Sequence, residues 1–111
     1  MPEAKPAAPR DFGKMNAADL AALPVAELTA GELEDAMRAA LKLDARDLAV
    51  AFAFAGTAKP ADPAKPDRYP FYAVLITGAV SEGNTEAALK HARDGAAFDA
   101  AHNAGKRAND Y

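Results

Sequence analysis

Apolar residues at helical spacing are clearest between residues 29 and 43. Thr29 and Glu32 stand three positions apart, an arrangement in which each side chain satisfies a free backbone N–H group at the start of a helix. The apolar residues that follow recur every three or four positions: Leu33, Met37, Ala40 and Leu41. This pattern predicts an amphipathic helix that begins after Thr29 and ends near Leu43.

The residues before this helix divide into a short helix and a tail. Asn16 can cap a helix that ends at Leu23, because Pro24 interrupts it. Residues 1–15 hold three prolines and scattered charge without periodicity, which predicts a flexible N-terminal arm. We therefore expect a single globular domain over residues 16–111.

Two apolar segments fit either a strand or a helix. In residues 47–55 large side chains alternate with alanine, which is a strand pattern, yet alanine is depleted in strands. As a helix this segment would be apolar nearly all round and central in the core, with Asp44 as its N-cap. In residues 70–80 the β-branched side chains favour a strand, and Gly78 weakens a helix by about 1 kcal/mol. We favour a mainly α domain of four to five helices. The alternative is an α+β fold with a two-stranded sheet from 47–55 and 70–80.

Prolines recur at every third position between these two segments. Pro60, Pro63 and Pro66 match the three-residue turn of polyproline II, which would place them on one face. We interpret residues 57–70 as a stiff Pro-rich linker inside the domain. A ligand for an aromatic groove in another protein is the alternative.

The last helix is rich in alanine. Asn84 or Thr85 caps it, and it is predicted to reach about Ala104, where Gly105 stops it. Five alanines repeat at strict four-residue spacing: Ala88, Ala92, Ala96, Ala100 and Ala104. Such a ridge of small side chains lets another helix approach closely. It either packs on the protein's own core or docks a partner.

The two histidines of the chain also lie on this last helix. His91 and His102 are eleven residues apart, so they share a face with Phe98 between them. At 1.5 Å rise per residue they are roughly 16 Å apart, too far for one metal ion. Only a helix break at Gly95 would bring them together. We therefore predict no metal site.

Two stretches resemble the tetratricopeptide repeat, a family of helix-turn-helix units. The sequence from Ala40 to Gly56 resembles the passage from one repeat's second helix into the next repeat's first helix. Later residues fall roughly where that family places its packing residues and its inter-helix glycine: Tyr72, Leu75, Gly83, Ala88, Leu89, Phe98 and Asp99. The chain departs from the family where Ala45 and Ala100 replace an expected proline, and where the spacing of the stretches exceeds its period of about 34 residues. The resemblance implies an all-α fold and a protein-binding role.

The composition argues against several classes of function. The 111 residues carry a net charge of −3 with dispersed basic residues, which argues against nucleic acid as a partner. No apolar run approaches the ~20 residues of a membrane span. The absence of cysteine excludes disulfides, thiolate metal sites and thiol nucleophiles. With no signal-peptide pattern either, we expect a soluble, cytoplasmic protein.

Residues that carry chemistry are few. Ser81 lies in a predicted turn, where local capping explains it, and no glycine-rich phosphate loop occurs. Tyr69, Phe71 and Tyr72 form the densest aromatic cluster, which we interpret as an anchor for the linker; a ligand groove is the alternative. We predict no catalytic residue and no cofactor, and an enzyme is the less favoured class.

These observations together predict a small protein-binding module. It would be an adaptor, accessory subunit or inhibitor that acts through helix packing, either on a protein partner or on a second copy of itself. The predicted partner-binding residues lie on the last helix: His91, Ala92, Ala96, Phe98, Ala100 and His102. The alternative function is a small-molecule-binding or catalytic α+β domain that uses the aromatic cluster and a histidine.

Overall fold

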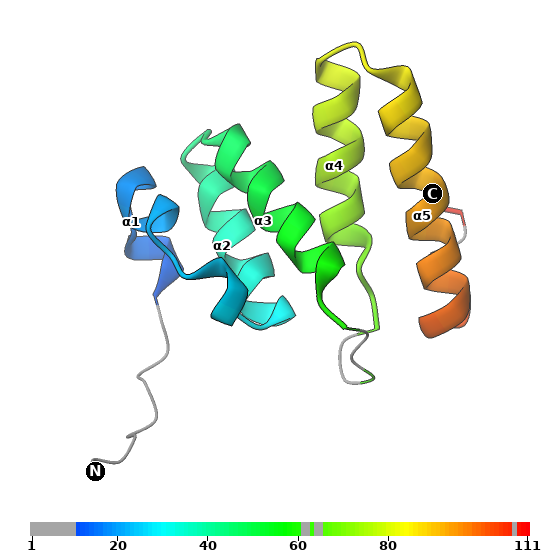
Figure 1. Ribbon diagram of the computed structural model, residues 1–111, viewed down its shortest axis with the longest axis horizontal. Helices are drawn as coiled ribbons and strands as arrows, with labels where there is room; N and C mark the ends of the chain where they lie inside the picture. Colours follow the sequence, from blue (N-terminus) through cyan, green and yellow to red (C-terminus); the bar gives the residue numbers. More distant parts are fainter. Residues whose placement is uncertain (1–10, 61–62, 64–65, 108) are drawn as a thin grey trace.

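The protein is mainly helical. The computed structural model describes residues 11–60, 63, 66–107 and 109–111, and this part contains helices and turns without a strand (Figure 1). The elements in chain order are η1 (Phe12–Lys14), α1 (Ala17–Ala21), η2 (Val25–Glu27), α2 (Ala30–Lys42), α3 (Arg46–Ala58), α4 (Tyr69–Ser81) and α5 (Thr85–His102). The α+β alternative is wrong, because residues 47–55 and 70–80 are both helical. The alternative function, a small-molecule-binding or catalytic α+β domain, therefore lacks the fold that it requires.

The helices lie beside one another in sequence order. Figure 1 shows α2, α3, α4 and α5 as successive antiparallel neighbours, and the main packing contacts join α2 to α3, α3 to α4 and α4 to α5. The chain thus forms two helical hairpins, α2 with α3 and α4 with α5. The linker joins them, and α3 packs against α4 where the two hairpins meet.

Three helix starts follow the side-chain signals in the sequence. Asn16 and Asp19 form a reciprocal capping box at α1, with hydrogen bonds of 2.8 and 3.2 Å. Thr29 and Glu32 do the same at α2, at 3.1 and 3.0 Å. At α5 the side chain of Asn84 accepts a hydrogen bond from the backbone N–H of Ala87. These three caps confirm the predicted starts of the helices.

Tertiary packing explains why α3 is a helix despite its alternating pattern. It lies between α2 and α4, so both of its sides are covered (Figure 1). Ala49 and Ala53 are completely buried and Phe52 is 2% exposed. On a strand the alanines would form one weakly packing face. On a helix they are distributed around the axis and let the neighbouring backbones approach closely.

The packing of α4 against α3 depends on a glycine. A Cβ added at Gly56 would overlap the ring of Phe71, which is 3% exposed. The aromatic ring therefore lies directly on the backbone of α3. This close approach places the start of α4 beside the end of α3.

Asp44 does not cap α3, which corrects the sequence-based expectation. Its φ is +57°, in the left-handed region, and the N-cap position is held by Ala45 without a side-chain hydrogen bond. The backbone N–H of Ala45 donates to the carbonyl of Ala40 at 2.9 Å, and that of Asp44 donates to Leu41 at 3.0 Å. This pair of bonds is the Schellman arrangement that ends a helix. Asp44 thus ends α2 rather than starting α3, a role usually taken by glycine.

The boundaries of the linker, the arm and the last helix also differ from those expected. The linker is shorter than residues 57–70, because α3 continues to Ala58 and α4 begins at Tyr69. The polyproline II prediction depends on residues 61, 62, 64 and 65, which lie outside the described part of the chain. At the N-terminus residues 1–10 lie outside it as well, and Phe12 is already packed in the core with 7% exposure. At the other end α5 stops at His102, before the Ala104 predicted.

Candidate docking surfaces

The alanine ridge of α5 does not form one continuous face. Ala88 is 8% exposed and faces the core, Ala92 and Ala96 are half-buried, and Ala100 is exposed. Residues four apart on an α-helix rotate by about 40°, so a strict four-residue repeat drifts around the axis. Ala104 lies beyond the helix with a φ of +55°. The inner part of the ridge packs on the core, and its outer part turns to solvent.

The face of α5 that packs inward carries Gly95 and Asp99. Both are buried, with Asp99 at 2% exposure. A Cβ at Gly95 would overlap the ring of Tyr111, so the end of the described chain lies directly on this helix. The helix is continuous through Gly95, and His91 and His102 therefore stay on separate turns. The described residues also contain no group of three potential metal ligands.

Asp99 holds the chain that follows α5. Its Oδ1 accepts a hydrogen bond from the Asn103 side chain at 2.8 Å, and its Oδ2 accepts one from the Arg107 backbone N–H at 2.9 Å. The Arg107 guanidinium then binds Asp67, 40 positions earlier, at 2.9 and 3.1 Å. Residues 103–107 and 109–111, called here the C-terminal clasp, are thereby folded back onto the start of α4.

The predicted aromatic cluster packs inside this arrangement. Phe71 and Tyr72 are buried, and Tyr69 is half-buried. The guanidinium carbon of Arg107 lies over the Tyr69 ring, 5.0 Å from its centroid. Tyr111 stands edge-on to Tyr69 and Tyr72, at 5.3 and 6.0 Å between ring centroids. Burial is the main cause that raises the pKa of Tyr72 and Tyr111 above its ordinary value. The cluster thus anchors the clasp and the end of the linker.

Arg68 is the buried residue that the sequence did not single out. It is 2% exposed, and its guanidinium donates to the carbonyl oxygens of Gly56 at 2.9 Å, Lys59 at 2.7 Å and Pro60. It also lies 4.9 Å from the centre of the Phe98 ring. A cation at the carbonyl end of a helix satisfies the last acceptors and the negative pole. Arg68 thus terminates α3 from a position ten residues after that helix ends.

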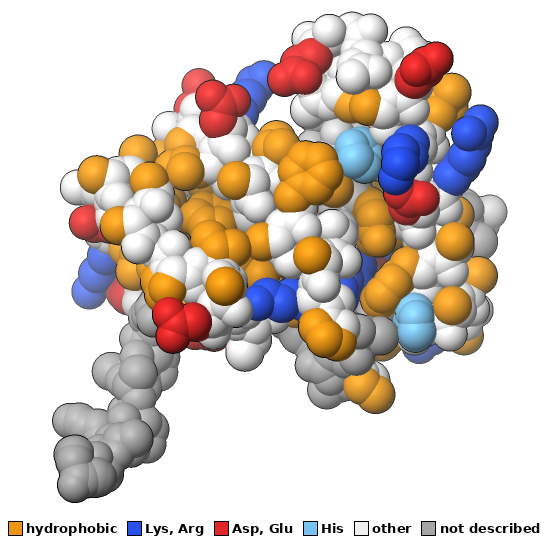
Figure 2. Space-filling model, in the orientation of Figure 1, with side chains coloured by type: hydrophobic (Ala, Val, Ile, Leu, Met, Phe, Trp, Pro, Cys, Tyr) orange, Lys and Arg blue, Asp and Glu red, His pale blue; other side chains and the backbone are white. Residues whose placement is uncertain are grey.

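Three of the six predicted partner-binding residues lie in a row along α5. His102 stacks obliquely on Phe98 with 4.5 Å between centroids, and His91 meets the edge of Phe54 from α3 at 5.6 Å. Phe54 is 53% exposed, a large value for this side chain. Figure 2 shows both histidines on the face of α5 turned toward the viewer. We call these four residues the aromatic row. The sequence did not predict Phe54 as part of a binding surface, because only the fold places it beside α5.

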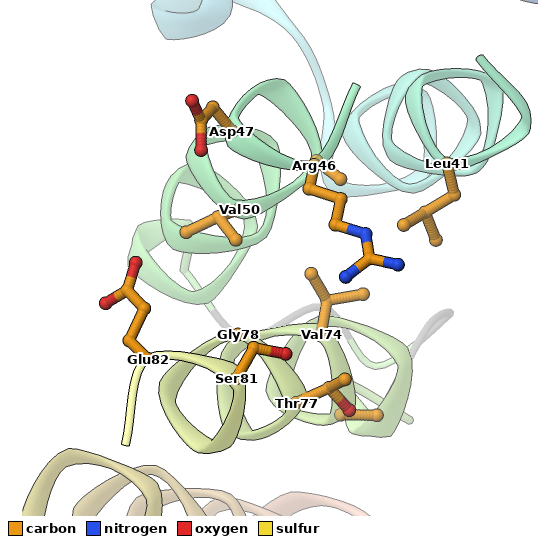
Figure 3. A pocket seen from close by; sticks show the side chains of 11 residues that line it. Leu41, Arg46, Asp47, Val50, Val74, Thr77, Gly78, Ser81 and Glu82 are labelled. Carbon is orange, nitrogen blue, oxygen red and sulfur yellow. The ribbon is translucent and has the colours of Figure 1, made fainter. Parts of the chain in front are cut away.

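A groove of about 430 Å³ opens at the N-terminal end of α3. It lies where the last turn of α2, the first turns of α3 and the last turns of α4 meet. Its walls include Leu41, Val50 and Val74, and polar side chains surround its mouth (Figure 3): Arg46, Asp47, Thr77, Ser81 and Glu82. None of these residues was predicted to form a site.

Comparisons with protein-family models, curated proteins and solved structures give no match. In the described part of the chain no helix has both the length and the apolar character needed to cross a membrane.

Proposed function

We propose that this protein is a protein-binding module that acts through helix packing, as an adaptor, accessory subunit or inhibitor. The observation that carries the proposal is the exposed ring of Phe54, which stands edge-on against His91 at 5.6 Å. Aromatic side chains that are rigidly held and still exposed are the usual anchors of protein interfaces.

The aromatic row supplies a surface long enough for a partner segment. Phe54 and His91 lie at one end, and Phe98 and His102 lie at the other, about two turns further along α5. Ala92, Ala96 and Ala100, the other three predicted residues, lie on other sides of α5, because a rotation of 100° per residue places them about 100° to 180° from His91 around the helix axis. We propose that a protein partner, or a second copy of this chain, covers the aromatic row.

Two further features support the proposal. The two hairpins are the arrangement that a resemblance to tetratricopeptide repeats implies, and repeats of this kind bury their faces against neighbours. The proposal includes a cytoplasmic location, which suits a chain without cysteine.

The test places a photoreactive phenylalanine analogue at Phe54 or at His102 and irradiates intact cells of the native host. Both positions should cross-link to the same protein. The control position is Val80, an apolar residue of α4 that is 64% exposed and lies outside the row. A cross-link from Val80 of equal strength, or none from either row position, would contradict the proposal. Light scattering over a range of concentrations then decides whether the partner is a second copy.

A further inference from the structure

The groove between α2, α3 and α4 is separate from the aromatic row and has the size of a small-ligand site. Its volume of about 430 Å³ falls within the range of ~300–1,000 Å³ typical of such sites. Leu41 contributes from α2, Val50 from α3 and Val74 from α4, so three helices enclose an apolar interior. Leu41 remains 44% exposed, which leaves apolar surface uncovered at the mouth.

Gly78 sets the depth of the groove at its α4 side. A Cβ at this position would lie 3.2 Å from the side chain of Val50, a tight contact. Without a side chain there, α4 stays close to α3 and Val50 forms part of the wall. Glycine is an unfavourable helix residue by about 1 kcal/mol, and at this position it leaves room beside Val50.

The side chains at the mouth of the groove carry more negative charge than positive charge. Arg46 is the basic residue of the lining, and its Nε already lies 3.4 Å from Oδ1 of Asp44. Asp47 and Glu82 are exposed, and within the described residues neither is in an ion pair. Figure 3 shows these two acids on one side of the groove and Arg46 on the other. The mouth therefore has an excess of negative charge on the side of Asp47 and Glu82.

We propose that this groove binds a small amphiphilic cation, with its apolar chain against Val50 and Val74 and its ammonium group beside Asp47 and Glu82. Charge complementarity selects a cation over an anion, because the basic group at the mouth is already paired and the two acids are not. The hydroxyl groups of Thr77 and Ser81 lie at the same mouth and suit the polar end of the ligand.

The dimensions favour a chain thinner than a helix. Along α4 the lining residues run from Ala73 to Glu82, roughly 14 Å at 1.5 Å per residue. A helical segment has a diameter of about 10–12 Å with side chains and is much wider than an alkyl chain. A single alkyl chain fits this space.

The test uses octyltrimethylammonium and octanoate as probes, which share an alkyl chain and differ in charge. Each is titrated into ¹⁵N-labelled protein below its micelle concentration, and amide shifts give the site and the affinity. The cation should shift the amides around Val50 and Gly78 and bind more tightly than octanoate. The double variant Asp47→Asn, Glu82→Gln should lose about 3- to 10-fold in affinity for the cation, as expected for two exposed ion pairs.

The control variant is Asp35→Asn, Glu86→Gln, which removes the same charges from exposed positions outside the groove. It should bind the cation as tightly as the parent protein. Equal binding of both probes, shifts that map outside the groove, or equal losses in the two double variants would overturn the proposal. Binding of a basic amphipathic peptide at the groove without binding of the octyl cation would overturn it in favour of a peptide site. So would a dimer that closes on the groove.

Discussion

The ring of Tyr111 lies directly on the backbone of Gly95, in the space that a side chain at that position would occupy. Gly95 sits in the middle of α5, where glycine costs about 1 kcal/mol relative to alanine. The contact fixes the C-terminal clasp against α4 and α5, together with the Arg107–Asp67 ion pair. A helix-weakening residue is thus explained by the ring that packs on it.

Gly95→Ala should release the clasp without unfolding the helix. The added methyl group displaces the Tyr111 ring, so the Tyr111 resonances should lose the ring-current shifts caused by Tyr69 and Tyr72. In a Tyr111→Ala background the clash is absent, and Gly95→Ala should then stabilise the protein by up to about 1 kcal/mol. NMR spectra of the Tyr111 ring measure its displacement, and urea unfolding of the parent, the two single variants and the double variant measures the change in stability. If Gly95→Ala stabilises equally in both backgrounds, the contact contributes nothing.

Arg68→Ala should be strongly destabilising. The substitution leaves the carbonyls of Gly56, Lys59 and Pro60 without the buried cation that now donates to them. We expect a loss of about 2 to 4 kcal/mol in the free energy of unfolding, because hydrogen bonds from charged groups are individually strong. Arg93→Ala, at an exposed position of α5, is the control and should change it by less than about 0.5 kcal/mol. Similar losses in both variants would refute this role of Arg68.

Asp44→Gly separates the two roles considered for this residue. If Asp44 is the left-handed residue that ends α2, with φ +57°, its replacement by glycine should raise the free energy of unfolding by up to about 1 kcal/mol. If Asp44 were the N-cap of α3, the same replacement would lower the free energy of unfolding by a few tenths of a kcal/mol. Asp44→Ala removes the same carboxylate without supplying glycine's freedom and should be the less stable variant. Thermal unfolding of the two variants is the measurement, and an Asp44→Ala protein as stable as Asp44→Gly would contradict the structure.

Alkaline pH should destabilise the protein through Tyr72 and Tyr111. Burial raises the pKa of both hydroxyl groups in the folded state above the ordinary value of 10.0. The stability that these two buried hydroxyl groups contribute is complete below pH 10. It is lost at higher pH, because the unfolded chain releases its phenolic protons first. Urea titrations between pH 8 and 11.5 should therefore show stability falling more steeply in the parent protein than in Tyr72→Phe, Tyr111→Phe. Parallel pH profiles would show that these two hydroxyl groups are not the cause.

Helix starts could be predicted because they depend on neighbours in sequence. The boxes at Asn16 and Thr29 need only a second side chain three positions away. The helical state of α3 followed from the low strand propensity of its alanines, although its alternation also matched a strand. Asp44 was assigned the wrong role because capping and left-handed conformations favour the same residue types.

The candidate sites were predicted only in part. His91, Phe98 and His102 share a face because an eleven-residue spacing is three turns on any continuous helix. Phe54 and the groove at Val50 and Val74 were missed, since their residues come from helices whose order in space the pattern does not specify. Arg68 looked like a linker residue, and nothing local indicates that a cation will be buried on another helix's carbonyls.

The sequence by itself determined where α1, α2 and α5 begin and favoured a mainly helical chain, because caps and periodicity act over three or four residues. Only the tertiary structure decided which face of α5 turns inward, how Arg68 ends α3, and that Tyr111 packs on Gly95. These outcomes depend on contacts between residues that are eight or more positions apart, and the 40 positions between Asp67 and Arg107 are the clearest case. Close packing selects such pairs by shape and charge across the assembled core, and no local pattern encodes that choice.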